Sequence, residues 1–325
     1  MAYICGAKTG NQQAATMEIH LLTPEEYART FNSHTPHVYN SVAFNEHNRH
    51  RADALHYLGF GDSSLRAGII LGERDGWLLS PFSAPFGGFT TRGQQSTGHI
   101  FQAVKALADY GRSCGKRIRI TLPPAIYSPT LIGQQTAALT AVAHRVEANV
   151  NHHVELDFSA GNARSKFQQK GRNTLNMASR QGFELREVSL SDAEGLGRVY
   201  EIIEANHRLL DHPLRMTPEQ IRSTAPLTGS MFLLMTRNGQ NAAAAMINRT
   251  KQGVAQVIYW GDLLEMRPLH PMNLLAQEAM NLMKEKGFSV MDIGPSGEGG
   301  VPAPGLCRFK ESVGCTVSAK FTFEL

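Results

Sequence analysis

The chain has 325 residues, of which 42% are hydrophobic and 18% are charged, and its net charge is +4. These values leave enough apolar side chains for one or two packed cores, and they exclude a wholly disordered chain and a strongly basic nucleic-acid-binding protein. Residues 1–17 lack the basic and apolar regions of a secretory signal, and no apolar run is long enough to span a bilayer. We therefore expect a cytoplasmic protein whose cysteines are free thiols: Cys5, Cys114, Cys307 and Cys315.

Local signals divide the first half of the chain into short elements. Thr23-Pro24 can begin a helix, because threonine caps a helix well and proline suits its first position. Arg74-Asp75-Gly76 has the composition of a hairpin turn, and Pro123-Pro124 ends a strand. The elements expected in chain order are a strand over 17–22, helices from 24 and near 41–50, strands over 54–60, 65–71 and 77–80, a helix over 96–110 and a strand over 117–122.

The second half repeats this order of elements, although the two sequences do not match residue by residue. Asn238-Gly239 is a strong two-residue turn signal, Pro271 begins a helix, and Gly294-Pro295 follows a strand. Each half thus combines three antiparallel strands, a crossover helix and a parallel strand, which favours an α/β (α+β) fold with mixed, mainly antiparallel sheets. The expected elements of this half are strands over 231–236, 242–248 and 254–261, a helix over 271–286 and a strand over 288–293.

A basic segment joins the two halves. Between Phe158 and Phe183 there is no acidic residue, and we expect a helix over 170–182 followed by a strand over 183–188. One side of this helix would be apolar, and the other would carry Lys170 and Asn173. That polar side could attract phosphate groups, and a solvated helix face is the alternative. The basic residues of the segment are Arg164, Lys166, Lys170, Arg172 and Arg180.

The segment over 304–314 is the other distinctive stretch. Pro304-Gly305 begins a short helix that ends at Gly314, and an alternating strand follows over 316–323. We expect Phe309 and Lys310 to project together from the start of this helix, with Arg308 beside them, where a lysine can meet an anionic substrate. The alternative is a helix cap with a weak surface ion pair of Lys310.

The two segments resemble motifs of the Fem-type (FemABX) aminoacyltransferases, and the repeated order of elements resembles tandem GNAT-like acyltransferases. The resemblance implies two GNAT-like units, over residues 1–160 and 161–325, with a cleft between them; a generic pair of α+β domains is the alternative. It also implies transfer of an acyl or aminoacyl group to an amine on a small molecule or cell-wall (peptidoglycan) precursor, without a covalent enzyme intermediate. The donor would be aminoacyl-tRNA or acyl-CoA. The rival readings are an acetyl-CoA-dependent N-acetyltransferase and a non-catalytic binding protein with the same fold.

Acyl transfer to an amine requires a deprotonated amine, a held carbonyl and stabilisation of the oxyanion. In the GNAT architecture the splayed ends of the central strands expose backbone N–H groups for this purpose, and here those strands are 254–261 and 288–293. We expect Lys310, Asp292 and Tyr259 to be catalytic. The loop over 80–89 resembles a Pro…Gly-Gly segment that lines the cleft, although turn-making alone would also explain it. The substrate-binding residues expected are Phe309, Arg308, Trp260, Phe86, Gly87, Gly88, Lys170 and Asn173.

We expect no metal and no tightly bound cofactor. The glycine-rich stretch over 294–300 lacks the Gly-Lys-Ser/Thr of a P-loop. The spaced glycines that hold the CoA pyrophosphate are also absent before the 271–286 helix, where Pro268 and Pro271 remove two backbone amides. His47 and His50 have no third ligand at a recognised spacing.

Overall fold

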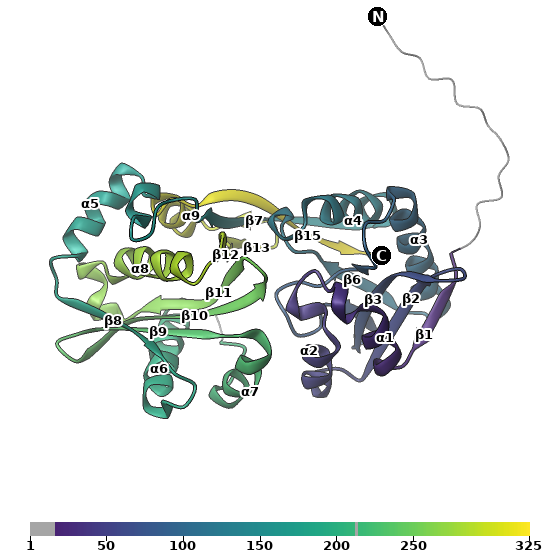
Figure 1. Cartoon of the computed structure of the whole chain (residues 1–325), viewed down its shortest axis with the longest axis horizontal. Helices are drawn as coiled ribbons and strands as arrows, with labels where there is room; N and C mark the ends of the chain where they lie inside the picture. Colours follow the sequence, from purple (N-terminus) through teal and green to yellow (C-terminus); the bar gives the residue numbers. More distant parts are fainter. Residues whose placement is uncertain (1–16, 212–213) are drawn as a thin grey trace, which may run out of the picture.

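The computed structural model describes residues 17–211 and 214–325, so the expectations for Cys5 and the rest of residues 1–16 fall outside it. Within these ranges a single mixed sheet of 13 strands runs through both halves of the chain (Figure 1). One face of the sheet is covered by α3 (Thr97–Ser113), α4 (Pro129–Val142), α5 (Gln169–Ala178), α8 (Pro271–Glu285) and α9 (Pro304–Ser312). The other face is covered by α1 (Pro24–Phe31), α2 (Val42–His47), α6 (Ala193–Leu209) and α7 (Pro218–Thr228).

The first half has the predicted order of strands. Thr23 caps α1 through a capping box with Glu26, and Asp75 and Gly76 have positive φ angles of 53° and 77° in a tight hairpin turn. Neighbouring strands are antiparallel except for the parallel pair β4–β6. The strands are β1 (Ile19–Leu22), β2 (Ala54–Gly61), β3 (Leu65–Arg74), β4 (Trp77–Ser80), β5 (Thr90–Thr91) and β6 (Arg117–Thr121).

The second half repeats this arrangement, as predicted. Asn238 and Gly239 form the two-residue turn with φ angles of 50° and 77°. The strand pairs are antiparallel until the last one, β11–β12, which is parallel. The strands are β8 (Phe183–Val188), β9 (Met231–Arg237), β10 (Gln240–Lys251), β11 (Val254–Asp262) and β12 (Val290–Pro295), and a small hairpin of β13 (Gly297–Glu298) and β14 (Val301–Pro302) follows.

Two strands exchange between the halves and make the sheet continuous. β7 (Arg145–Glu155), from the first half of the chain, pairs with β12 of the second half. The C-terminal strand β15 (Thr316–Glu324) pairs along β7 and, at its end, with β6 of the first half. The strand order is therefore β1-β2-β3-β4-β6-β15-β7-β12-β11-β10-β9-β8. The boundary expected at residues 160 and 161 stays a prediction.

Each half has its own apolar core. In the first half α3 and α4 pack on strands β2 to β6, and in the second half α8 packs on strands β9 to β12. A third cluster lies between the opposite face of β9 and β10 and helices α6 and α7. Among the described residues, Cys114, Cys307 and Cys315 are unpaired, and no helix is both long and apolar enough to cross a membrane.

Candidate active site

The parallel strands β11 and β12 separate at the centre of the second half. Their pairing ends at Gln256 and Asp292. Just beyond this point the register of β11 against β10 shifts, so that Ile258 is an extra residue in a β-bulge. Two diverging strands with a bulge can present backbone N–H groups to a ligand, which is the arrangement expected from the sequence. We call this region the β11–β12 opening.

Helix α9 lies against both strands of the β11–β12 opening. The Phe309 ring packs edge-to-face on Trp260 of β11, with ring centroids 5.9 Å apart. Lys310 Nζ donates hydrogen bonds to the three last carbonyl groups of β12, those of Ile293, Gly294 and Pro295, over 3.0, 2.9 and 2.9 Å. A lysine ammonium has three protons, so its donors are all used.

The prediction that Lys310 projects outward from the start of a helix is wrong. Because α9 begins at Pro304, Lys310 falls in its last turn, and only 2% of its surface is exposed. Burial lowers the pKa of Lys310 to about 8, while Cys315 and Asp292 oppose the shift. Arg308 is exposed and has none of these contacts. The structure thus brings Lys310, Phe309 and Trp260 to the opening and leaves Arg308 on the surface.

Asp292 is fully buried and forms the centre of a polar network. Its carboxylate accepts hydrogen bonds from Tyr127 Oη at 3.0 Å, Asn151 Nδ2 at 2.8 Å, Gln256 Nε2 at 3.1 Å and its near neighbour Gly294 N at 3.0 Å. Tyr127 comes from the first half of the chain and Gln256 from β11. Asp292 therefore connects the two halves of the chain. The sequence predicts that Asp292 lies exposed at the end of its strand, and this prediction is wrong because the carboxylate is buried.

Phe86 lies next to this network, between the two halves of the chain. We call the cluster of His37, Tyr39, Phe86 and Tyr127 the aromatic join. The Phe86 ring is completely buried and packs against His37, Tyr39 and Tyr127, at centroid distances of 4.7, 5.2 and 4.7 Å. His37 is 2% exposed, its ring nitrogens have no side-chain partner among the described residues, and the backbone of Gly87 lies close enough to act on the ring.

Gly87 and Gly88 are buried in the same loop. Gly87 N donates to Thr121 O at 2.8 Å, and a Cβ on Gly88 would lie 2.7 Å from Gln135 Oε1. These glycines are needed because the backbone approaches its neighbours closely. The expectation that Phe86, Gly87 and Gly88 line an open cleft is therefore wrong for this structure.

Tyr259 lies on the opposite face of the sheet from Trp260. Its ring packs edge-to-face on His207 of α6, at 5.3 Å. Burial raises the pKa of the Tyr259 hydroxyl, and the positive charges of Arg215 and Arg51 oppose this shift. Neither arginine forms an ion pair with a carboxylate in the described ranges. The sequence analysis missed both arginines, because they lie more than 160 residues apart and neither belongs to a recognised motif.

The basic helix α5 lies away from the β11–β12 opening and packs on α8 and α9. Lys170 and Asn173 are both exposed on it, and Asn173 Oδ1 accepts a hydrogen bond from Gln169 Nε2 at 3.0 Å. The structure therefore places these two predicted binding residues on the outer surface, apart from Lys310 and Tyr259.

Gly171 allows α5 to approach α9, which leads to a prediction. A Cβ on Gly171 would lie 2.1 Å from the carbonyl oxygen of Ser312, so Gly171→Ala should destabilise the protein by about 1–3 kcal/mol. Gly133 in α4 is the matched control, because a Cβ there meets nothing within 4 Å, and Gly133→Ala should stabilise by up to about 1 kcal/mol. Urea unfolding of both variants measures this difference, and equal effects would contradict the packing of α5 on α9.

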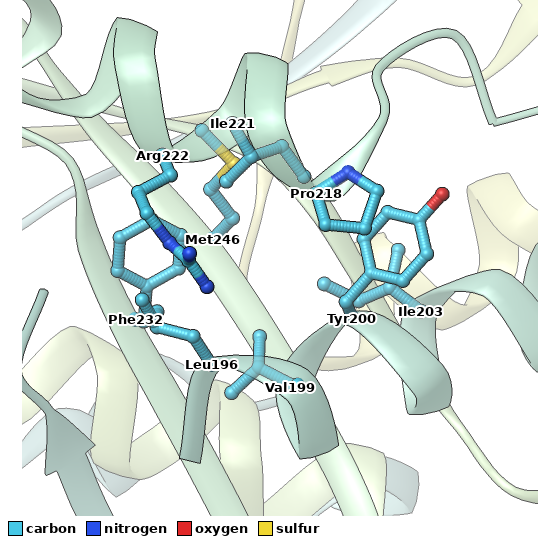
Figure 2. Close-up of a pocket in the computed structure, with 10 residues that line it drawn as sticks. Leu196, Val199, Tyr200, Ile203, Pro218, Ile221, Arg222, Phe232 and Met246 are labelled. Carbon is cyan, nitrogen blue, oxygen red and sulfur yellow. The ribbon is translucent and has the colours of Figure 1, made fainter. Parts of the chain in front are cut away.

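An apolar pocket lies between α6 and α7, above β9 and β10 (Figure 2). It contains no residue predicted from the sequence, but Met246 in its wall pairs across the strands with Tyr259. The Arg222 side chain extends from α7 toward α6 across the pocket (Figure 2). The lining residues labelled there are Leu196, Val199, Tyr200, Ile203, Pro218, Ile221, Arg222, Phe232 and Met246.

Solved structures with similar folds exist, although no protein-family model and no curated protein matches this sequence. FemX superposes with a TM-score of 0.63 at 11% identity, over 95% of this chain and 97% of its own. The C-terminal domain (DUF2156) of a putative lysylphosphatidylglycerol synthetase from Agrobacterium fabrum has a TM-score of 0.58 at 14% identity, over 92% and 91% of the two chains. A tandem GNAT protein from the clavulanic acid biosynthesis pathway has a TM-score of 0.54 at 13% identity, over 95% and 98%.

Identities this low show the fold alone. The superpositions extend over nearly the whole of both chains, so they include both halves and the strands that join them. They confirm the resemblance of fold predicted from the sequence. This chain has the tandem GNAT-like fold of the FemABX type.

Proposed function

We propose that this protein transfers an acyl or aminoacyl group to an amine acceptor, and that the amine attacks the acyl carbonyl directly. The observation that carries the proposal is the β11–β12 opening: two parallel strands part at Gln256 and Asp292 beside the bulge at Ile258, and α9 fixes both strands. Backbone N–H groups held at such an opening can stabilise the oxyanion of a tetrahedral intermediate without a covalent enzyme intermediate.

In this proposal Lys310 is a positioning residue. Its three hydrogen bonds hold the end of β12 in place, and a direct contact with substrate would require it to release at least one carbonyl. Asp292 holds the other side of the same strand through its buried network. The geometry of the opening then depends on both residues, which is how each contributes to catalysis.

The acceptor in this proposal carries an anionic group such as phosphate or carboxylate. Arg51 from the first half and Arg215 from the second both act on the Tyr259 hydroxyl, and their charges are not neutralised by a described carboxylate. Two such guanidinium groups favour a phosphorylated or carboxylated acceptor. An amine-bearing cell-wall precursor meets this requirement.

Aminoacyl-tRNA is the favoured donor, with acyl-CoA second. Pro271 occupies the first position of α8 and Pro268 lies in the turn before it, so this helix start lacks backbone amides that would hold a CoA pyrophosphate. Lys170 is exposed on α5, and Arg164 and Arg180 are exposed on either side of this helix, so these three residues offer a surface that could attract RNA.

Two measurements test the donor. Calorimetric titration with acetyl-CoA at low and moderate salt should show no saturable binding at the higher salt. Mass spectrometry should then detect an aminoacylated acceptor after incubation with charged tRNA and a peptidoglycan-precursor peptide. Saturable acetyl-CoA binding that persists with salt would favour the N-acetyltransferase, and binding of both ligands without any product would favour the non-catalytic protein.

A lysine substitution tests the positioning role of Lys310. Lys310→Ala leaves three carbonyl groups of β12 without a donor, and the resulting displacement of the strand should lower the transfer rate by about 100-fold. Lys284 of α8 is the matched control, because its Nζ also donates to a carbonyl, that of Leu156 at 2.7 Å, outside the opening. Both variants are checked for folding by circular dichroism, and equal transfer rates would contradict this role.

A further inference from the structure

The point where β11 and β12 part is occupied by one polar side chain from each strand. Gln256 and Asp292 are the last residues paired in the parallel register, and Gln256 Nε2 donates to Asp292 Oδ2 at 3.1 Å. We call these two residues the fork pair. Beyond them the described residues show no backbone pairing between β11 and β12. Backbone hydrogen bonds therefore no longer fix the spacing of the two strands there, and side-chain contacts must set it.

Two tyrosine hydroxyls from the first half of the chain contact the fork pair, one on each strand. Tyr39 Oη donates to Gln256 Oε1 of β11 at 2.8 Å, and Tyr127 Oη donates to Asp292 Oδ2 of β12 at 3.0 Å. Each tyrosine belongs to its own short 3-10 helix, and their exposed fractions are 3% and 0%. The first half of the chain thus contacts both strands of the opening at the residues where the strands part.

Strand β10 also contacts both hydroxyl groups. Asn248 Nδ2 donates to Tyr39 Oη at 3.3 Å, and Thr250 Oγ1 lies 3.2 Å from Tyr127 Oη. Tyr39 therefore connects β10 to β11, and Tyr127 connects β10 to β12. Because the fork pair joins the two tyrosines as well, these contacts form one closed network, and such a network makes a buried region rigid.

The aromatic join fixes the spacing of the two hydroxyl groups. Phe86 packs edge-to-face on both tyrosine rings, with centroids 5.2 Å from Tyr39 and 4.7 Å from Tyr127. Phe44 also packs on Tyr39, at 5.1 Å. Burial raises the pKa of both hydroxyls, so each keeps the proton that it donates. The two tyrosines are thus donors held at a fixed separation.

The lysines around the fork pair do not contact its side chains. Lys251 Nζ donates to the carbonyl oxygen of Tyr127, and Lys310 Nζ donates to carbonyl groups beyond the fork pair. Lys320 Nζ lies 5.8 Å from the centroid of the Phe86 ring.

The two members of the fork pair differ in their other partners. Asn151 of β7 donates to Asp292 Oδ1, so Asp292 has a further side-chain contact. The Gln256 side chain has no partner within the described ranges other than Tyr39 and Asp292. The position of β11 at the fork pair therefore depends most directly on Tyr39.

We propose that Tyr39 and Tyr127 set the separation of β11 and β12 at the opening and are positioning residues of the transfer reaction, an inference that rests on the proposed function. Both residues are buried, so they act through the fork pair on the backbone N–H groups of the opening. A displacement of such groups by about 1 Å weakens their contact with the oxyanion and can cost about 100-fold in rate. The first half of the chain then contributes to catalysis through the geometry of the second half.

Hydrogen exchange measures the opening without turnover. Tyr39→Phe keeps the ring in the aromatic join and removes the hydroxyl that donates to Gln256. Backbone amides in peptides that cover residues 257–262 and 293–296 should then exchange about 10-fold faster, as measured by mass spectrometry. Tyr127→Phe is a second variant with the same expected result.

Tyr57→Phe is the matched control for the exchange experiment. Tyr57 is 4% exposed, and its Oη donates to Glu46 Oε1 at 2.6 Å inside the first half. Its loss should leave the exchange of the two opening peptides unchanged. If Tyr39→Phe and Tyr57→Phe had equal effects on these peptides, the proposal would be overturned.

Turnover tests the positioning role. Tyr39→Phe should lower kcat by about 10- to 100-fold and leave KM unchanged, because a buried hydroxyl that touches no substrate acts on the transition state alone. Tyr57→Phe should keep both constants when rates are corrected for the folded fraction. A wild-type kcat in Tyr39→Phe, or a change in KM only, would overturn the assignment. Absence of transfer by the wild-type protein would overturn the proposed function instead, while hydrogen exchange still reports on the two tyrosines.

The double variant tests whether the two tyrosines act together. Tyr39→Phe and Tyr127→Phe both loosen the same fork pair, so the combined loss of kcat should be smaller than the product of the two single losses. Losses that multiply would show two independent contacts, and the single network described here would then be wrong.

Discussion

Replacing Asp292 with alanine is expected to destabilise the protein by about 3–5 kcal/mol, the range observed when one partner of a buried charged network is removed. The carboxylate is completely buried, and three side chains from distant parts of the chain donate to it: Tyr127, Asn151 and Gln256. Without it, these donors stay in the interior with no acceptor, and each such group is costly. Urea unfolding monitored by circular dichroism gives the change in free energy.

Asp292→Asn refines the test, because it keeps the shape and removes two acceptor sites. Oδ1 accepts from Asn151 and from Gly294 N, and Oδ2 accepts from Tyr127 and Gln256. Wherever the new amide nitrogen lies, it faces two donors. On the Oδ2 side the Tyr127 hydroxyl can turn to Thr250 Oγ1 at 3.2 Å, so a smaller loss of about 1–3 kcal/mol is expected.

Asp157→Ala is the control for both substitutions at Asp292. Its side chain is 68% exposed and pairs with Lys166 on the surface, so its removal should leave the free energy of unfolding almost unchanged. If Asp292→Ala were no more destabilising than Asp157→Ala, the network would not hold the two halves together. The structural role of Asp292 proposed here would then be wrong.

Much of the fold could be predicted because its signals are local. The capping box at Thr23, the turn at Asn238-Gly239 and the helix start at Pro271 depend on residues that are neighbours in sequence. The repeated order of strand, helix and parallel strand follows from these boundaries, and the pairs β4–β6 and β11–β12 confirm it.

The parts that could not be predicted depend on residues far apart in sequence. The pairing of β7 with β12 and of β15 with β6 joins segments more than a hundred residues apart, and no local pattern encodes it. The sequence assigns no helix to α4, where the polar Gln135 occupies the buried side and interrupts the apolar periodicity; it is held there by Phe89 N at 2.8 Å.

The candidate site follows the same rule. The region where β11 and β12 part could be predicted from the strand ends, whereas the direction of the Lys310 side chain depends on three carbonyl groups of another segment. Tyr259 could be predicted as a site residue from its position at the end of a strand. Arg51 and Arg215, which act on its hydroxyl, could not, because they come from different halves of the chain. Local sequence signals therefore predict where the candidate site lies. The orientation and environment of its side chains depend on polar contacts between residues far apart in the sequence.

The protein should lose stability in acid through His37. The ring is 2% exposed among Tyr39, Phe86 and Tyr127, and burial lowers its pKa to about 3 from 6.5. Between these two values the unfolded chain binds a proton at His37 and the folded protein does not. The free energy of unfolding is therefore not reduced by His37 above pH 6.5, and it decreases as the pH falls from 6.5 toward 3. At pH 4.5 the loss should reach about 2–3 kcal/mol.

His37→Phe removes the titrating group and keeps an aromatic ring in the join. The variant should be about as stable as the wild type at pH 7, because a buried polar ring without side-chain partners is replaced by an apolar ring. Between pH 7 and pH 4.5 it should lose about 2–3 kcal/mol less stability than the wild type in urea unfolding. His34→Phe, at an exposed position three residues earlier, should leave the acid dependence unchanged. If wild type and His37→Phe lost equal stability between pH 7 and pH 4.5, water would reach the His37 ring. The packing of Phe86 against His37 would then not exclude solvent, contrary to the structure described above.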